Sequence, residues 1–291
     1  MSEKPCLAFC NDIDFGTWEG YLEVHQTLDG LGIPTEDSFW LFAPGGSEMA
    51  LFEDSINRKG PKHEEILQEI RERRLTIMHS AGDFSFTASP IRPTRKLVAE
   101  ALEYLDQHAR IPHIWTNHGD EGDLCNIGGV TPTYQQGDRP DSEAYVLDLL
   151  LQAGVRHFWT DHNYSHDFVF DTVEKAGQPL QVEERTRSGH VIQCFNRYRG
   201  NLPKAPDTQT LAWQLREENI LELTEKQGVT IIYQHWLMSR DDQGRPVAAK
   251  SPVLPAEAID RLQVLSALAR DDQVRITCLS ELLERPRTNQ L

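Results

Sequence analysis

Hydrophobic and polar positions follow two alternating spacings along most of the 291-residue chain. Short apolar runs, typical of buried β-strands, are separated by longer segments whose apolar positions recur at helical spacing. The expected strands cover residues 6–9, 38–42, 75–78, 113–116, 157–160, 229–233 and 274–277. The expected helices cover residues 18–31, 63–74, 94–107, 142–153, 213–227, 256–268 and 280–283. This alternation predicts a parallel sheet, either doubly wound or closed into a barrel.

Two segments interrupt the alternation. Residues 118–140 are rich in Gly, Asp, Asn and Pro and are longer than an ordinary connection, as functional loops often are. Residues 161–210 form an irregular insertion, in which short antiparallel strands are expected near residues 180–182 and 191–195. No glycine-rich phosphate-binding pattern follows a strand, which counts against a nucleotide-binding fold.

Acids, amides and histidines follow the expected strands at their carboxyl ends. They are Asp12 and Asp14, His79, Asn117 and His118, Asp161 and His162, and His235. In α/β barrels the active residues occupy these strand ends, so the pattern favours a barrel with one site at that edge.

Asp12 and Asp14 follow the first apolar run directly. Two positions apart on an extended strand, they would point to the same face. Like charges held together raise one pKa or recruit a cation, which suggests one carboxylate for metal and one for proton transfer. The alternative is a solvated turn in which one acid caps the next helix.

A metal site is predicted from Asp14, His79 and Asp83. His79 and Asp83 are four residues apart, so a turn of the chain can bring both to one ion. Two carboxylates and one imidazole suit a divalent ion, Zn²⁺ first and then Mn²⁺, Co²⁺, Ni²⁺ or Fe²⁺, and three ligands leave a position for water. Taken alone, His79 would be interpreted as a hydrogen-bonded loop histidine.

His235 follows a buried strand, and histidine is the residue type best suited to proton transfer at neutral pH, so it is predicted to be a general acid. The alternative is a histidine with a structural hydrogen bond at the rim. Residues near the same edge are expected to bind substrate, the aromatic ones by stacking on sugar rings unless they belong to the core. They are Asn117, His118, Trp159, Asp161 and Trp236.

The net charge of −16, from 29 basic and 45 acidic residues, argues against nucleic acid or an anionic membrane as the partner. A local basic patch could still be formed by Arg185, Arg187, Arg197 and Arg199, but a solvated charged face is the preferred interpretation. Five scattered cysteines without CxxC spacing, and no apolar signal core or membrane-length run, predict a cytoplasmic protein without membrane insertion. The sequence leaves open whether the chain forms a homo-oligomer.

The residues at these strand ends resemble the motifs of the NodB-like polysaccharide deacetylases, a family of the glycoside hydrolase/deacetylase β/α-barrel superfamily. Asn11-Asp12-Ile13-Asp14 is similar to the family's acid pair, and Ile232-Tyr233-Gln234-His235 to its late strand that ends in histidine. The resemblance implies that Asp12 is the base and Asp14 a metal ligand. It also implies one domain over residues 1–291, an α/β fold built as a distorted TIM-like barrel of about seven parallel strands with a small antiparallel insertion.

The chain departs from the family pattern at two places. The family's His-Ser/Thr-x-x-His motif appears as His79-Ser80-Ala81-Gly82-Asp83, with Asp at the second ligand position. The family's arginine-proline motif, which orients the base, is absent, and residues 115–119 stand near its place.

The predicted function is therefore a metal-dependent hydrolase that removes an acyl group, acetyl in the family, from an N-acylated sugar or a related amide. Metal-activated water, Asp12 as base and His235 as acid would carry the reaction. Two alternatives remain: a metal-independent barrel hydrolase that uses Asp12 and Asp161, and a non-catalytic carbohydrate-binding relative that keeps Trp115, Trp159 and Trp236.

Overall fold

The computed structural model describes residues 4–85, 91–119, 121–128, 133–160, 180–200 and 204–285. Its strands are β1 (Cys6–Asn11), β2 (Asp37–Phe42), β3 (Ala50–Phe52), β4 (Leu75–His79), β5 (Ile114–Thr116), β6 (His157–Trp159), β7 (Gln181–Arg185), β8 (Val191–Phe195), β9 (Val229–Gln234), β10 (Met238–Arg240), β11 (Pro246–Ala248) and β12 (Arg275–Ile276). Its helices are α1 (Trp18–Leu31), α2 (His63–Arg71), α3 (Arg95–His108), α4 (Leu147–Gln152), α5 (Leu211–Gln214), α6 (Glu217–Glu225), α7 (Ala256–Arg270) and α8 (Leu279–Leu283).

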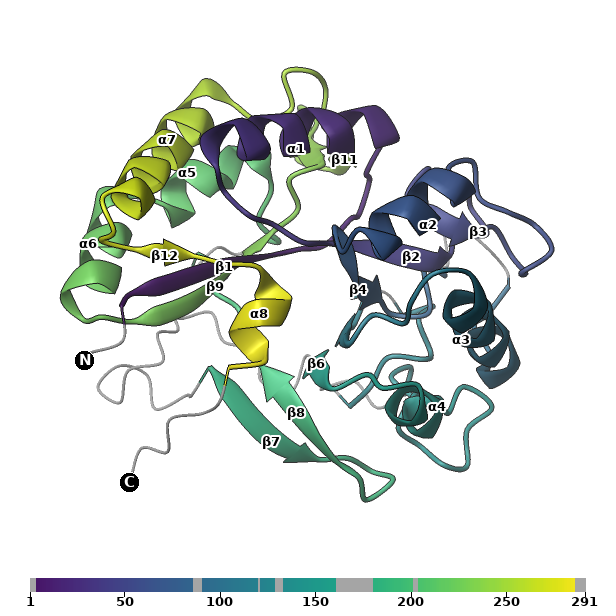
Figure 1. Ribbon diagram of the computed structural model, residues 1–291. Helices are drawn as coiled ribbons and strands as arrows, with labels where there is room; N and C mark the ends of the chain where they lie inside the picture. Colours follow the sequence, from purple (N-terminus) through teal and green to yellow (C-terminus); the bar gives the residue numbers. More distant parts are fainter. Residues whose placement is uncertain are drawn as a thin grey trace.

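The main sheet is parallel apart from one hairpin and is curled into a half-barrel (Figure 1). Its order is β12-β1-β2-β4-β5-β6-β8-β7, with β9 on the other side of β1 and β3 beside β2. A single bridge between Tyr198, after β8, and Ile232 of β9 brings the two ends of the curl together. The described residues show this half-barrel but not the closed barrel that we expected.

Strand β1 runs through the middle of the molecule with all six residues buried. It pairs with β9 along its whole length, from Cys6 opposite Val229 to Asn11 opposite Gln234. Leu7 and Phe9 face the larger hydrophobic core, whereas the alternate residues face a smaller one. Because both faces are covered, the strand has a continuous apolar sequence rather than an alternating one.

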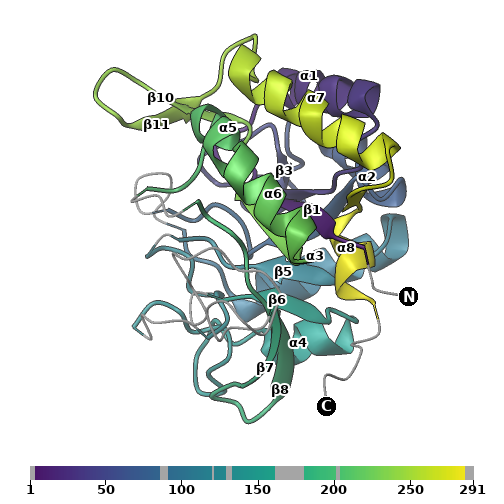
Figure 2. The same cartoon turned by 90° about the vertical axis from the view of Figure 1, so that its left-hand side faces the viewer.

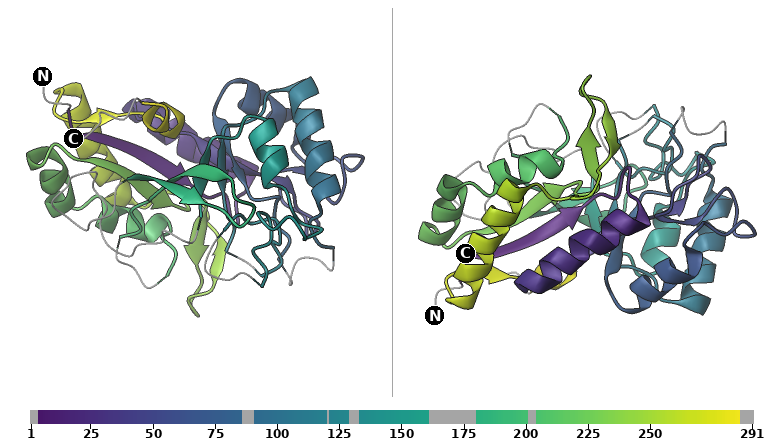
Figure 3. Two further views of the ribbon diagram at one scale, coloured as in Figure 1. Left: turned by 90° about the horizontal axis from the view of Figure 1, so that it is seen from below. Right: turned by 90° about the horizontal axis from the view of Figure 1, so that it is seen from above.

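The helices cover the sheet in two groups, with α1 and α7 side by side in one and α2, α3 and α4 in the other (Figures 1 and 3). Local signals set their ends. Thr17 and Thr94 cap α1 and α3 through their hydroxyl groups, and Gly32 ends α1 in a left-handed conformation with φ of 67°. The predicted bounds of α1 are confirmed.

Three expectations differ from the structure. The helix expected over 213–227 is divided into α5 and α6, because the backbone is extended at Arg216, with ψ of 157°, between the two helices. Helix α4 begins five residues late, at Leu147, since the preceding residues form turns. Strands β3, β10 and β11 were not predicted, and the β10–β11 hairpin projects from the body (Figure 2).

The antiparallel pair expected in the 161–210 insertion is confirmed as β7 and β8. Strand β8 also pairs in parallel with β6, which makes the hairpin part of the main sheet. Among the described residues, no helix combines the length and the apolar character needed to span a membrane.

Candidate metal centre

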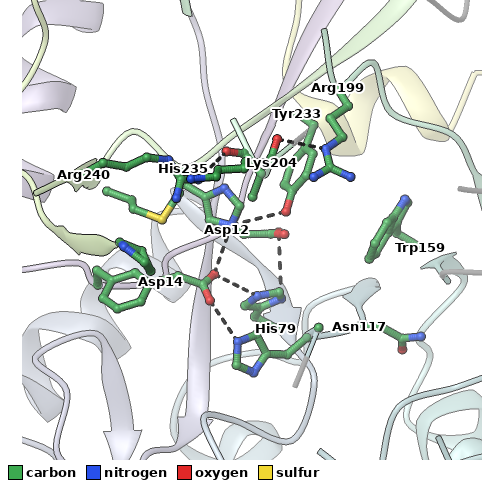
Figure 4. A pocket seen from close by; sticks show the side chains of 16 residues that line it. Asp12, Asp14, His79, Asn117, Trp159, Arg199, Lys204, Tyr233, His235 and Arg240 are labelled. Carbon is green, nitrogen blue, oxygen red and sulfur yellow. Dashed lines mark hydrogen bonds and ion pairs between the residues drawn. The ribbon is translucent and has the colours of Figure 1, made fainter. Parts of the chain in front are cut away.

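Three histidines converge on the carboxylate of Asp14, and two of them, His79 and His235, are labelled in Figure 4. The Nε2 atom of His118 lies 2.9 Å from Asp14 Oδ1, and the Nε2 atoms of His79 and His235 lie 3.2 and 3.4 Å from Oδ2. His79 ends β4, and His118 and His235 follow β5 and β9. Parallel strands thus bring four separate segments to one edge of the sheet.

Two overlapping sets of side chains in the described residues could hold a metal ion. One is Asp14, His79 and His118, and the other is Asp12, Asp14 and His235. Within each set the ligand atoms lie no more than 4.8 Å apart. Imidazole nitrogens and carboxylate oxygens are the donors of catalytic zinc sites, so the residues present fit a divalent ion.

The first set also has the outer partners that orient metal ligands. His118 donates from Nδ1 to Asp123 Oδ2 at 2.6 Å, and His79 Nδ1 lies 2.7 Å from Thr116 Oγ1. Both contacts leave Nε2 directed toward Asp14, as in the carboxylate–histidine–metal arrangement. The Trp40 ring packs against both imidazoles, with centroids 4.4 Å from His79 and 4.8 Å from His118.

The charges in this cluster are mutually compensating. Burial opposes the charged form of His118, but Asp123 and Asp14 outweigh it and raise the pKa of this imidazole well above its ordinary value. Burial likewise opposes the Asp14 carboxylate, yet the histidines hold its pKa well below the ordinary value. A metal ion would take over the role of the His118 proton.

Asp12 is buried and forms an ion pair with Arg197, whose Nη1 lies 2.9 Å from Oδ1. The guanidinium is held between two aromatic rings, 3.8 Å from the Trp159 centroid and 3.7 Å from that of Tyr233. Burial would raise the pKa of Asp12, but the charge of Arg197 outweighs it and the pKa is lowered. Asp12 is therefore ionised at neutral pH.

The interpretation of Arg197 as part of a solvated charged face is wrong, because its side chain is buried against Asp12 in the candidate site. Arg197 follows the apolar run of β8 by two positions. Asp12 was selected because it is a charged residue at the end of a buried strand, and Arg197 meets the same criterion. It lies beside Asp12, and its side chain is buried.

The orientation of the His235 ring is set by contacts with Pro206 and Tyr233. Its Nδ1 donates to the Pro206 carbonyl at 2.8 Å, which directs Nε2 toward Asp14 and the Tyr233 hydroxyl, 3.2 Å away. Burial, and then Asp12, raise the pKa of Tyr233 well above its ordinary value, so this phenol stays protonated.

Asp83 is not in either set of potential ligands within the described chain. After His79 the backbone turns at Ser80, with φ of 51°, and Gly82 bridges to Phe42 so closely that a Cβ would lie 1.9 Å from the Phe42 oxygen. Asp83 consequently faces a neighbouring cavity, where its Oδ1 accepts from the Ser85 amide. His118, predicted only as a substrate contact, takes the place beside Asp14.

The other predicted substrate contacts have different surroundings. Asn117 lines the cavity, but its side-chain amide donates to the Ile127 carbonyl and accepts from the Ile127 amide. These two hydrogen bonds anchor the loop that carries His118. Trp159 lines the cavity and stacks on Arg197. Trp236 is buried outside that lining, with its indole donating to Asp37. Asp161 lies outside the described residues.

The centre lies where two cavities meet. One, of about 550 Å³, is lined by Asp12, Asp14, His79 and His235. The other, of about 600 Å³, contains Asp83. Asp14, Phe15 and His118 line both, so two of the candidate ligands, Asp14 and His118, face both cavities.

Comparisons with known proteins do not assign a family. No protein-family model and no curated protein matches the chain. An uncharacterized protein from Agrobacterium tumefaciens C58 is similar in structure at 13% identity, with a TM-score of 0.46 over 96% of this chain and 89% of that one.

Proposed function

We propose that the protein is a metal-dependent hydrolase that removes an acyl group, acetyl in the simplest case, from an N-acylated sugar or a related amide. The observation that carries the proposal is the division of the site. Asp14, His79 and His118 offer a ligand set with its own outer partners, while Asp12 and His235 face the same cavity with separate supports. A ligand set beside an acid and a base that have their own hydrogen-bonding partners suits metal-dependent amide hydrolysis.

Asp12 is the proposed base. Its carboxylate is ionised because Arg197 stabilises the charge, and the same contact fixes one of its oxygens. Asp12 therefore accepts the proton of the attacking water, and Arg197, sandwiched between two rings, keeps the carboxylate from rotating away. In the NodB-like family that the chain resembles, an arginine-proline motif orients the base. This chain lacks that motif, and we propose that Arg197 orients Asp12 instead.

His235 is the proposed acid. In its protonated form it donates from Nε2 to the leaving nitrogen, while Nδ1 keeps its bond to the Pro206 carbonyl. The protonated phenol of Tyr233 next to Nε2 does not compete as a base, so the proton is directed to the substrate.

Asp14, His79 and His118 would hold a divalent ion, zinc by the chemistry of these donors, and that ion would supply the Lewis acidity that polarises a carbonyl and lowers the pKa of water. The NodB-like resemblance is consistent with this role for Asp14. It also leads us to propose that the half-barrel is a distorted form of that family's barrel.

The proposal is tested by metal analysis and by acetate release from N-acetylglucosamine and its short β-1,4 oligomers. We expect the zinc-loaded protein to release acetate, Asp12→Asn to keep zinc and lose turnover by about 100-fold or more, and His79→Ala to lose zinc. A protein that binds none of Zn²⁺, Mn²⁺, Co²⁺ or Ni²⁺ would contradict the proposal. Cleavage of glycosidic bonds without an ion would favour the two-carboxylate alternative.

A further inference from the structure

Basic side chains line one wall of the cavity that contains Asp12. They are Arg199, Lys204 and Arg240, and they lie on the side of Tyr233 and His235 (Figure 4). The chain as a whole has a net charge of −16, so this cluster opposes the overall charge of the molecule. Cations gathered in a cavity of an acidic protein attract an anionic ligand to that place.

The wall is built as one unit around His235. Arg199 donates from Nε to the Lys204 carbonyl at 3.1 Å, and Arg240 donates from Nη2 to the Ala205 carbonyl at 3.0 Å. The next residue, Pro206, accepts the hydrogen bond of His235. The backbone segment of Lys204, Ala205 and Pro206, which accepts hydrogen bonds from Arg199 and Arg240, is therefore also the one that orients the proposed acid.

Two cations of this wall have contacts of different kinds. Arg240 forms an ion pair with Asp207 at 3.0 Å, whereas Lys204 Nζ approaches the neutral carbonyl of Gly244 at 3.4 Å. Burial, and the nearby charge of Arg240, lower the pKa of Arg199, as is expected where cations lie close together.

The carboxylates among the described lining residues are engaged at the centre. Asp12 is paired with Arg197, and Asp14 is surrounded by histidines. The second cavity differs, because Glu48 and Asp83 are among its lining residues and none of the basic wall is. An anionic substrate group is thus favoured on one side of the centre and repelled on the other.

We propose that the substrate carries a carboxylate or phosphate on the part that bears the leaving amine, and that Lys204 and Arg199 bind this group. The inference rests on the proposed function for its orientation, since His235 is the group that faces the leaving nitrogen. Both anions are recognised by the same charge-assisted hydrogen bonds from lysine and arginine.

The test uses the zinc-loaded full chain and three probes: N-acetylglucosamine, its 6-phosphate and the corresponding N-acetylated uronic acid. Binding is measured by calorimetry and turnover by acetate release. We expect at least one anionic probe to bind about tenfold or more tightly than the neutral sugar, with a preference that shrinks as salt is added. Which anion is preferred identifies the source of the charge.

Matched variants assign the preference to the wall. Lys204→Gln and Arg199→Gln should each reduce it by about threefold or more without changing the affinity for the neutral sugar. Lys96→Gln is the control, because Lys96 is an exposed lysine on α3, outside the cavity lining. Thermal melting of each variant verifies that it is folded.

The outcomes separate the two proposals. Equal binding of charged and neutral probes, or no binding of either anion, overturns the anionic site even if acetate is released. An anionic preference that the two wall variants remove supports the site even if no probe is hydrolysed, and the hydrolase proposal is then the one that fails. A preference that persists in both variants also overturns the site.

Discussion

At the residue scale, the ability of the candidate centre to bind an ion depends on whether each imidazole directs its Nε2 atom toward Asp14. His79 and His118 each have Nδ1 engaged by a buried neighbour, Thr116 or Asp123, which leaves Nε2 for an ion. Asp14 supplies the carboxylate between them. Donor atoms held in this way are already arranged for binding, so little side-chain ordering remains to oppose it.

The ligand set is testable by substitution. His118→Ala should abolish stoichiometric zinc binding, and Asp123→Asn should weaken it by about 10–100-fold because the orienting carboxylate is lost. Asp83→Asn should bind zinc like the parent, since Asp83 lies outside the cluster. The measurement is a competition titration against a zinc-binding dye. If the Asp83 variant loses zinc and the His118 variant keeps it, the metal ligand is Asp83, as predicted from the sequence, and not His118.

The ion pair between Arg197 and Asp12 leads to a prediction about the free energy of unfolding that can be tested without an activity assay. Arg197→Met leaves the buried Asp12 carboxylate without its partner, which should lower the free energy of unfolding by about 3–5 kcal/mol. The double variant Arg197→Met with Asp12→Asn should recover a large part of this loss, because no buried charge remains. Urea unfolding measures both. A double variant as unstable as the single one would show that the packing between Trp159 and Tyr233, not the charge, dominates.

At the scale of elements, α1, β2 and the segment after β9 are joined by a buried polar cluster. His25 of α1 lies 2.6 Å from Asp37 of β2, and the indole of Trp236 donates to the other oxygen of Asp37 at 3.1 Å. Trp236 also donates its backbone amide to the Asn11 side chain at the end of β1. These contacts fix the strand ends from which Asp12 and His235 project.

The His25–Asp37 pair predicts a pH-dependent stability. Burial opposes the charged imidazole, but Asp37 outweighs it and raises the pKa of His25 above its ordinary 6.5. The folded state then holds a proton that the unfolded state releases, so the contribution is complete below pH 6.5 and declines as pH rises through the folded pKa. The difference in unfolding free energy between the parent and His25→Gln should therefore shrink from pH 6 toward alkaline pH. A constant difference across this range would contradict a charged pair.

At the scale of the whole molecule, the half-barrel brings together groups that are distant in sequence. Asp14, His79 and His118 come from the segments after or at the ends of β1, β4 and β5, and α1, β2, α2 and α3 lie between them in the chain. An ion bound there would connect three strands of one sheet, so binding and folding are coupled.

Removal of the metal should accordingly lower the melting temperature. An ion present at 100 times its dissociation constant stabilises the native state by about 2.7 kcal/mol, which corresponds to a shift of several degrees in a chain of this size. Calorimetry of the zinc-loaded protein before and after chelation measures it, with zinc added back as the reversal. His79→Ala should not respond to chelation, and an equal response in that variant would place the ion elsewhere.

The sequence by itself determined most of the strands and helices of the main sheet and the strand ends at which the candidate site lies. Apolar runs such as that of β1 are long enough to identify strands buried on both faces, and the threonine cap and glycine end of α1 mark its limits without help from the fold. Polar residues that follow such runs are costly to bury. For that reason the sequence alone identifies Asp12, Asp14, His79 and His235 as candidates.

Only the tertiary structure decided which side chains contact Asp12 and Asp14. Asp83 is close to His79 in sequence, but the turn at Ser80 and Gly82 directs it away, and His118 arrives from another strand. Arg197 reaches Asp12 across 185 positions of the chain. Sequence spacing constrains neighbours within one element, whereas contacts between strand ends depend on sheet order and curl, and those are set by the packing of the whole core.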